Sequence, residues 1–294
     1  MGYVQCCRML DHKVVNVAII GCGTVGGAAA QLLISDRALI RERTGIDIQL
    51  TRIVSRRLDH ARSLGLPEDL LGTDIEEALA DTSIDVVIEL IGGTDTAREI
   101  VLKAVSSGKH VVTANKALLA HHGEELWAAA REHSVSIGFE ASCGGGIPII
   151  RAITDGLAAN HIDAIYGIVN GTSNFILTEM IEKGETYAEA LAEAQHIGLA
   201  EADPTLDVAG VDSAHKIAIM SSLAFGLKVD FDSIPVGGIH TLEAIDVAYG
   251  TRLGYVVKLL AVAIRVESGV SLFVRPAFIS REHPLSSVSV PFNA

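Results

Sequence analysis

Four acidic side chains and one lysine gather in the stretch GLAEADPTLDVAGVDSAHK, residues 198–216, which is otherwise small and apolar. A solvated helix face would instead carry charges of both signs at regular spacing. Carboxylates set into an apolar wall can hold an ammonium group through charge-assisted hydrogen bonds. Glu201 and Asp207 are the candidates for that role, whereas Asp203, which precedes Pro204, is predicted to be a turn residue.

Asp212 and Lys216 lie four residues apart in the same stretch, so on a helix they share one face. Asp212 could then aim the ammonium group of Lys216. An ammonium group beside a reacting oxygen can stabilise a developing alkoxide and supply its proton. The alternative is an ordinary i,i+4 ion pair, worth about 0.3–0.5 kcal/mol.

A glycine-rich turn near the N-terminus has the form of a dinucleotide-binding fingerprint, G-x-G-x-x-G. Its residues are Gly21, Cys22, Gly23, Thr24, Val25 and Gly26, and they follow the apolar run VVNVAIIGC. The first glycine allows the tight turn, the second lets the backbone approach a pyrophosphate, and the third lets helix and strand pack closely. We therefore expect the phosphates at the N-terminus of the following helix.

The end of the second predicted strand indicates which dinucleotide is used. NAD sites usually carry an acidic residue there, but this sequence continues with Ser55, Arg56 and Arg57. Arginine forks suit a 2′-phosphate, so NADP is favoured over NAD. The alternative is that both arginines are solvated loop charges. Two further predicted strand ends, Gly92-Gly93-Thr94 and Thr113-Ala114-Asn115-Lys116, point to the same crevice.

The predicted elements that must position these residues alternate between strand and helix over the first half of the chain. Strands are expected at 14–22, 48–55, 84–93, 109–116 and 135–142, with helices at 28–44, 96–108 and 123–134, and a turn and a helix within 66–81. This order predicts an α/β fold with a Rossmann-type doubly wound parallel sheet.

After the glycines of SCGGGIP, 142–148, the pattern changes to long Ala-rich helices beside a few strands. Helices are expected at 149–159, 176–183, 187–196 and 210–225, and strands at 162–174, 234–240 and 271–279. A second, α+β domain is therefore predicted. We expect an N-terminal extension over 1–13, a dinucleotide-binding domain over 14–146 and a substrate-binding and dimerisation domain over 147–294.

Composition excludes several classes of protein. Apolar residues make up 49% of the chain but aromatic residues only 4%, as in helices packed on buried parallel strands. The net charge of −13, without a basic run, argues against a nucleic-acid partner. No apolar run is long enough to span a membrane, and four cysteines without a C-x-x-C pair predict a reducing, cytoplasmic location.

The chain resembles the homoserine dehydrogenases. The resemblance rests on the whole stretch 198–216 and on five further motifs in the family's order: GCGTVG (21–26), IGGTDTA (91–97), TANKALL (113–119), EASCGGGIPI (140–149) and NGTSNFIL (170–177). It implies interconversion of L-homoserine and L-aspartate 4-semialdehyde with NAD(P)H, in threonine, methionine and isoleucine biosynthesis. It also implies a homodimer.

The family's site residues carry over position by position. The resemblance implies that Lys216 is the catalytic acid/base and that Lys116 is its partner near the nicotinamide. The catalytic role expected for Asp212, which is to orient Lys216, comes from their spacing. Substrate binding is implied for Glu201, Asp207, Asp212, Thr172 and Gly171. The fingerprint and the strand ends themselves predict cofactor binding by Gly21, Gly23, Thr24, Val25, Gly26, Arg56, Arg57, Gly93, Thr94 and Lys116.

The loop between the two predicted domains has two competing functional interpretations. The resemblance implies a sodium ion held largely by backbone carbonyls at Glu140, Cys143, Gly145 and Ile147. Alternatively, Cys143, which stands where family members usually carry valine, is the nucleophile of a semialdehyde-oxidising dehydrogenase. A third possibility is that these glycines only form a hinge, which needs neither a sodium ion nor a nucleophile.

The resemblance also implies a longer chain. Family members usually continue past PLSSVSVPFNA, 284–294, and many bacterial members add a small regulatory domain. We therefore expect the second domain to be truncated. A third hypothesis beside the two enzymes is a non-catalytic dinucleotide-binding sensor.

Overall fold

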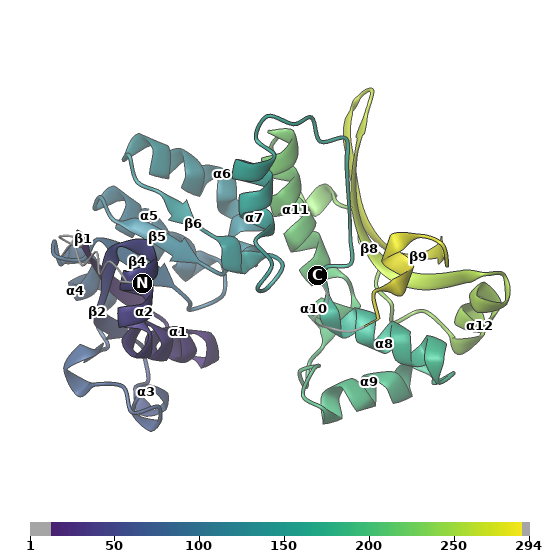
Figure 1. Cartoon of the computed structure of the whole chain (residues 1–294), viewed down its shortest axis with the longest axis horizontal. Helices are drawn as coiled ribbons and strands as arrows, with labels where there is room; N and C mark the ends of the chain where they lie inside the picture. The colour runs from purple at the N-terminus through teal and green to yellow at the C-terminus, as the bar shows by residue number, and fades with distance from the viewer. Residues whose placement is uncertain (1–12, 290–294) are drawn as a thin grey trace, which may run out of the picture. The chain divides into compact units, whose positions relative to one another are not determined.

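A computed structural model describes residues 13–289 of the chain (Figure 1), so most of the expected N-terminal extension lies outside the described residues. The chain divides into two compact units. The first holds the described residues up to Leu118 together with His122–Phe139, and the second holds Leu119–His121 and the chain from Glu140 onward. The boundary expected near Gly146 lies a few residues further along and remains a prediction.

The first unit is built on a six-stranded, wholly parallel sheet in the order β3-β2-β1-β4-β5-β6. Its strands are β1 (Lys13–Ile20), β2 (Ile46–Val54), β3 (Leu71–Gly72), β4 (Val86–Glu89), β5 (His110–Thr113) and β6 (Ile137–Gly138). The chain runs outward from β1 to β3 and then returns to the other side of β1 for β4. The predicted Rossmann-type α/β fold is therefore confirmed.

The helices of this unit are α1 (Thr24–Ser35), α2 (Arg37–Thr44), α3 (Asp59–Ser63), α4 (Ile75–Ala80), α5 (Asp95–Ser106) and α6 (Lys116–Glu132), with the 3₁₀ turn η1 (Glu68–Leu70). The single helix expected over 28–44 is wrong, because Asp36 leaves helical geometry and separates α1 from α2. The strand expected over 135–142 is limited to two residues, and the 3₁₀ turn η2 (Glu140–Ser142) follows it.

The second unit contains a three-stranded antiparallel sheet in the order β7-β8-β9, made of β7 (Ala164–Gly167), β8 (Tyr255–Val266) and β9 (Gly269–Ser280). Figure 1 shows β8 and β9 as one long hairpin. β8 was not predicted from the sequence, because eight of its successive residues are buried and its apolar run lacks the alternation of a half-exposed strand. The strand expected over 234–240 is wrong, since that segment makes only an isolated bridge between Val236 and Val274.

The helices of the second unit are α7 (Ile149–Arg151), α8 (Gly171–Glu182), α9 (Tyr187–His196), α10 (Thr205–Val208), α11 (Val211–Phe225) and α12 (Ala244–Arg252), with a π-helical turn η3 (Ala152–Gly156) and two 3₁₀ turns, η4 (Phe231–Ser233) and η5 (Pro284–Ser287). The strand expected over 162–174 ends early, because Asn170 caps α8 by accepting a hydrogen bond from the Ser173 amide. No helix within residues 13–289 is long and apolar enough to cross a membrane.

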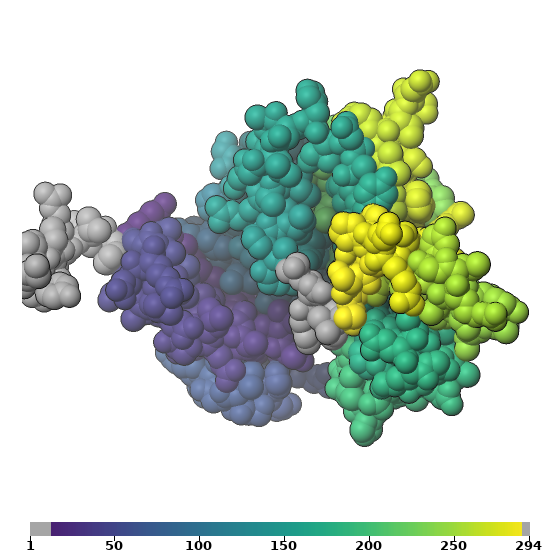
Figure 2. All heavy atoms as spheres, turned by 45° about the vertical axis from the view of Figure 1, so that its right-hand side comes forward, coloured from purple at the N-terminus to yellow at the C-terminus, as the bar shows by residue number. Residues whose placement is uncertain are grey.

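Lys258, a buried lysine on β8, connects three parts of the second unit through hydrogen bonds. Its amine donates to Asn174 Oδ1 on α8 at 3.0 Å and to the carbonyl of Val288. Burial lowers the pKa of Lys258. Figure 2 shows the segment after β9, in yellow, next to the green surface formed by α8 and α9. The end of the described chain is thus fixed to the helix that begins at NGTSN.

Candidate functional site

A cavity of about 540 Å³ lies at the carboxyl ends of the parallel strands in the first unit. Gly21, Cys22 and Gly23 after β1, and Ser55, Arg56 and Arg57 after β2, line it together with Leu90, Ile91 and Gly92 after β4. This volume falls within the range of small-molecule sites, and the crevice between β1 and β4 is where such sheets bind dinucleotides.

The three fingerprint glycines have different surroundings. A Cβ added to Gly21, whose φ is +105°, would lie 2.5 Å from the backbone of Leu90, and one added to Gly26 would lie 1.9 Å from the Gly21 oxygen. A Cβ on Gly23 would meet nothing within 4 Å. Gly21 and Gly26 are therefore required by the packing of the turn, whereas Gly23 leaves open space where a ligand can approach the backbone.

The N-terminus of α1 meets the requirements of an anion site. Gly23 is its N-cap and provides no side-chain cap, while Thr24 and Val25 are exposed in its first turn. Backbone N–H groups at such a terminus attract phosphates. Burial raises the pKa of Cys22, which keeps this thiol protonated and adds no negative charge to the turn. The residues present therefore fit a dinucleotide.

A hydrogen-bonded chain joins the loops after β4 and β5. Glu89, which is completely buried, accepts from the amide of Ile91 at 2.9 Å and from Thr113 Oγ1 at 2.6 Å. Asn115 donates to the carbonyl of Gly93 at 2.7 Å, and its Oδ1 caps α6. Since Lys116 is the first residue of α6, this chain fixes the backbone that carries it. Thr94, at the end of the same loop, is the N-cap of α5.

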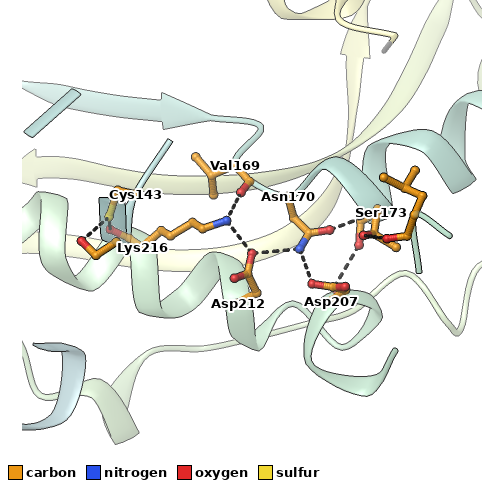
Figure 3. Close-up of polar contacts among 10 residues, drawn as sticks. Cys143, Val169, Asn170, Ser173, Asp207, Asp212 and Lys216 are labelled. Carbon is orange, nitrogen blue, oxygen red and sulfur yellow. Dashed lines mark hydrogen bonds and ion pairs between the residues drawn. The ribbon is translucent and has the colours of Figure 1, made fainter. Parts of the chain in front are cut away.

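In the second unit, Lys216 is held by two acceptors (Figure 3). Its Nζ lies 2.8 Å from Asp212 Oδ2 and 2.6 Å from the carbonyl oxygen of Val169. The side chains of Lys216 and Asp212 are 17% and 6% exposed. The two bonds use two of the three N–H donors of the ammonium group. Asp212 and Lys216 thus form the pair that their spacing on α11 predicted, in a largely buried setting.

Asn170 connects this pair to a second carboxylate. Its Nδ2 donates to Asp207 Oδ1 at 2.7 Å and to Asp212 Oδ2 at 2.8 Å, as Figure 3 shows. Ser173 Oγ donates to the carbonyl of Asp207 at 2.9 Å. Asn170 is not among the site residues predicted from the sequence. The signal was the run of amides and hydroxyls in NGTSN, which by itself is equally typical of a helix cap.

The remaining predicted substrate residues lie around this cluster in different ways. Gly171 begins α8, and Thr172 donates to the carbonyl of Leu199 at 3.3 Å, at the start of the acidic stretch. Glu201 is exposed, and its carbonyl accepts from Gln195 at 3.1 Å. Among the contacts of the described residues, no hydrogen bond links the Glu201 carboxylate to Lys216. Asp203 accepts from Thr205 and forms the predicted turn.

The loop expected to hold sodium uses its polar groups internally. The Glu140 carboxylate accepts from the amides of Ile150 and Arg151 at 2.9 and 3.0 Å and caps α7. The carbonyl of Ile147 accepts from the amide of Ile149, and Gly145 has a φ of +59°. Residues 13–289 contain no group of three or more His, Cys, Asp or Glu arranged to hold a metal, and the expected sodium ion, which would use backbone carbonyls, stays a prediction.

Cys143 is buried and lies against α11. Its Sγ is 4.0 Å from the carbonyl oxygen of Lys216, toward which it can donate, and 3.7 Å from Ser142 Oγ. A reactive nucleophilic cysteine is instead partly exposed. This geometry is that of a packed core thiol.

Two family models match the chain, the homoserine dehydrogenase NAD-binding domain over residues 21–140 and the homoserine dehydrogenase domain over residues 148–294. The chain is 48% identical to the homoserine dehydrogenase of Pseudomonas aeruginosa over 96% of its own length and 64% of that protein. It thus spans somewhat under two thirds of this relative.

Solved structures agree with the family models. A homoserine dehydrogenase from Thiobacillus denitrificans matches 95% of the chain and 64% of its own length, with a TM-score of 0.90 and 46% identity. A putative homoserine dehydrogenase from Archaeoglobus fulgidus is 30% identical, with a TM-score of 0.83 over 94% of this chain and 87% of its own. The glycine fingerprint and the acidic stretch agree with the fold and with the two family models. The chain belongs to the homoserine dehydrogenase family.

Proposed function

We propose that the chain interconverts L-homoserine and L-aspartate 4-semialdehyde with a nicotinamide dinucleotide, as part of amino-acid biosynthesis leading to threonine, methionine and isoleucine. The observation that carries the proposal is the partly buried cluster of Lys216, Asp212, Asn170 and Asp207, which combines a proton-transfer group with carboxylates. Membership of the family and the dinucleotide crevice of the first unit support it.

Each end of homoserine has a chemical partner in this cluster. Homoserine carries an ammonium, a carboxylate and a hydroxyl group. Asp207 and Glu201 are proposed to bind the ammonium group, because charge-assisted hydrogen bonds to carboxylates are the strongest available to it. Thr172 and the amide of Gly171, at the N-terminus of α8, are proposed to bind the substrate carboxylate.

Lys216 is proposed to move the proton. In the oxidising direction the C4 hydroxyl loses its proton to the Lys216 amine while the C4–H bond breaks and its electron pair leaves with the hydrogen. A nicotinamide dinucleotide held by the glycine turn at Gly21 and Gly23 would supply the acceptor for this hydride, and the donor in the reverse direction. Asp212 orients Lys216 through the 2.8 Å contact, and Lys116 is proposed to act beside the nicotinamide.

The direct test is a spectrophotometric assay of the 294-residue chain with L-homoserine and NAD or NADP. The proposed function predicts homoserine-dependent absorbance of the reduced nicotinamide. Binding of the dinucleotide without any homoserine-dependent signal would contradict the enzyme and support the sensor hypothesis.

We further propose that NADP is preferred over NAD. Arg56 and Arg57 line the cavity where the second strand ends, and Ser55 stands where an acidic residue would select NAD. Replacing both arginines by alanine should raise KM for NADP by about 10- to 100-fold, the effect of losing a charge-assisted hydrogen bond worth about 1.5–3 kcal/mol.

The same double variant should leave KM for NAD within about twofold, because NAD lacks the 2′-phosphate. Arg62→Ala is the matched control, since Arg62 pairs with Glu68 on the surface and does not line the cavity. Equal loss with both dinucleotides would mean that the arginines do not select the cofactor.

Cys143→Ala should retain turnover. The buried thiol contacts the carbonyl of Lys216 and needs no further chemistry in the proposed reaction. We expect a kcat within about threefold of the wild-type value and a small loss of stability, about 1 kcal/mol, from the missing sulfur. Complete loss of activity with a normal thermal unfolding curve would instead support the Cys143 nucleophile.

We also propose a cytoplasmic homodimer that acts on small molecules. The absence of a basic run and the acidic net charge support a small-molecule enzyme over a nucleic-acid-binding protein.

A further inference from the structure

We propose that Asn170 is a positioning residue that holds the carboxylates of Asp207 and Asp212 in one fixed arrangement, so that Asp212 faces Lys216 and Asp207 faces the substrate ammonium. The inference rests on the proposed function and adds to it a residue that touches neither the hydroxyl nor the hydride being transferred.

The hydrogen bonds of Asn170 leave one possible orientation of its amide. The two N–H groups of Nδ2 point to two different carboxylates, at 2.7 and 2.8 Å, and Oδ1 accepts from the Ser173 amide at 2.8 Å. The reversed amide would place its oxygen against two carboxylate oxygens and its NH₂ group against an N–H donor. Since the residue is only 5% exposed, water cannot compensate for that loss.

The bridge joins parts of the chain that local structure would not align. Asn170 lies at the start of α8, Asp207 on the short helix α10 and Asp212 at the start of α11. Gly210, with a φ of +85°, lies between the two acidic residues, so their relative direction depends on a turn. The Asn170 amide, bonded to both carboxylates, therefore fixes their relative position, which α10 and α11 alone do not fix.

The Asn170 side chain is uncharged, and this matters for substrate binding as much as its two N–H donors do. Two carboxylates against the single ammonium of Lys216 leave excess negative charge, which a second ammonium, that of the substrate, can neutralise. A lysine or arginine at position 170 would occupy that place itself. An amide separates the two carboxylates without a positive charge and keeps Asp207 available for the substrate.

Three variants separate positioning from capping of α8. Asn170→Asp and Asn170→Ser both retain a good N-cap but lose the two N–H donors, and Asn170→Ala loses cap and bridge together. If Asn170 positions the carboxylates, the Asp and Ser variants should lose kcat by about 10- to 100-fold in assays run well below their unfolding transitions, where each variant is fully folded. Thr186→Ala, which removes the cap of α9, is the control and should lose stability without losing kcat.

The split between KM and kcat provides a readout that a merely structural residue would not move. Asn170 is proposed to hold Asp207 toward the substrate ammonium and Asp212 toward Lys216, so its variants should raise KM for homoserine and lower kcat together, while KM for the dinucleotide stays within about twofold. If both variants turn over like wild type with an unchanged KM for homoserine, Asn170 only caps α8 and the inference is wrong.

The outcome for the wild-type chain separates this inference from the proposed function. An inactive wild-type chain would overturn the proposed function and the role of Asn170 with it. An active wild-type chain with fully active Asp and Ser variants would overturn the role of Asn170 alone.

Discussion

Lys216→Ala is expected to lower kcat for homoserine oxidation by about 10²- to 10⁴-fold, the usual contribution of a positioned proton-transfer group. The side chain is 17% exposed and held by Asp212 and the Val169 carbonyl, so its removal takes away the group proposed to exchange a proton with the C4 hydroxyl. Initial rates with saturating dinucleotide, measured from the absorbance of the reduced nicotinamide, report the change. Binding of the dinucleotide, measured by fluorescence, should stay within about twofold.

Lys183→Ala is a matched control for this variant. Lys183 and Glu179 are also an i,i+4 pair on a helix, but the lysine side chain is 53% exposed. Lys183 is not part of the proposed site, so its loss should leave kcat unchanged, although Glu179, which is only 10% exposed, loses its ion-pair partner and stability falls by about 1–3 kcal/mol. Lys216→Arg keeps the positive charge but cannot release a proton, and it should be nearly as inactive as Lys216→Ala. An active Lys216→Ala would rule out Lys216 as the acid/base.

Two glycine-to-alanine replacements in the same turn are expected to have different effects. Gly26→Ala places a Cβ 1.9 Å from the Gly21 oxygen, which the backbone cannot accommodate, so α1 must move away from β1. We expect a loss of stability of several kcal/mol, at the upper end of single substitutions, together with loss of dinucleotide binding. Thermal unfolding of the free chain detects the first effect.

Gly23→Ala should leave stability nearly unchanged, because its Cβ would meet nothing within 4 Å. Dinucleotide binding should nevertheless weaken by about tenfold or more, since the methyl group occupies the space through which the backbone approaches the pyrophosphate. Titration of the reduced dinucleotide by fluorescence measures this. If Gly23→Ala binds as tightly as wild type, the phosphates do not lie at the N-terminus of α1.

Expectations that rest on short-range patterns agree with the structure. The fingerprint between Gly21 and Gly26 requires only a strand, a turn and a helix in sequence, and β1 and α1 provide them. The i,i+4 spacing of Asp212 and Lys216 fixes a shared helix face because the helical repeat is local.

Predictions of some whole elements and of element ends were less accurate, for physical reasons. β8 is buried on both faces and so lacks the alternation that marks a half-exposed strand. Asp36 interrupts an otherwise helical pattern between α1 and α2. In NGTSN the residues suit both a strand end and an N-cap, and the cap of α8 prevails because Asn170 Oδ1 bonds the Ser173 amide.

The sequence by itself determined the parallel dinucleotide-binding sheet, the family and the Asp212–Lys216 pair, because periodicity, glycine spacing and helical repeat act within about ten residues. Only the tertiary structure decided that Asn170 bridges Asp207 and Asp212, which follow it by 37 and 42 residues, and that Glu89 bonds Thr113, 24 residues away. Such partners are selected by how elements pack. A buried polar group must find a hydrogen-bond partner, and which one it finds depends on the fold rather than on neighbouring residues.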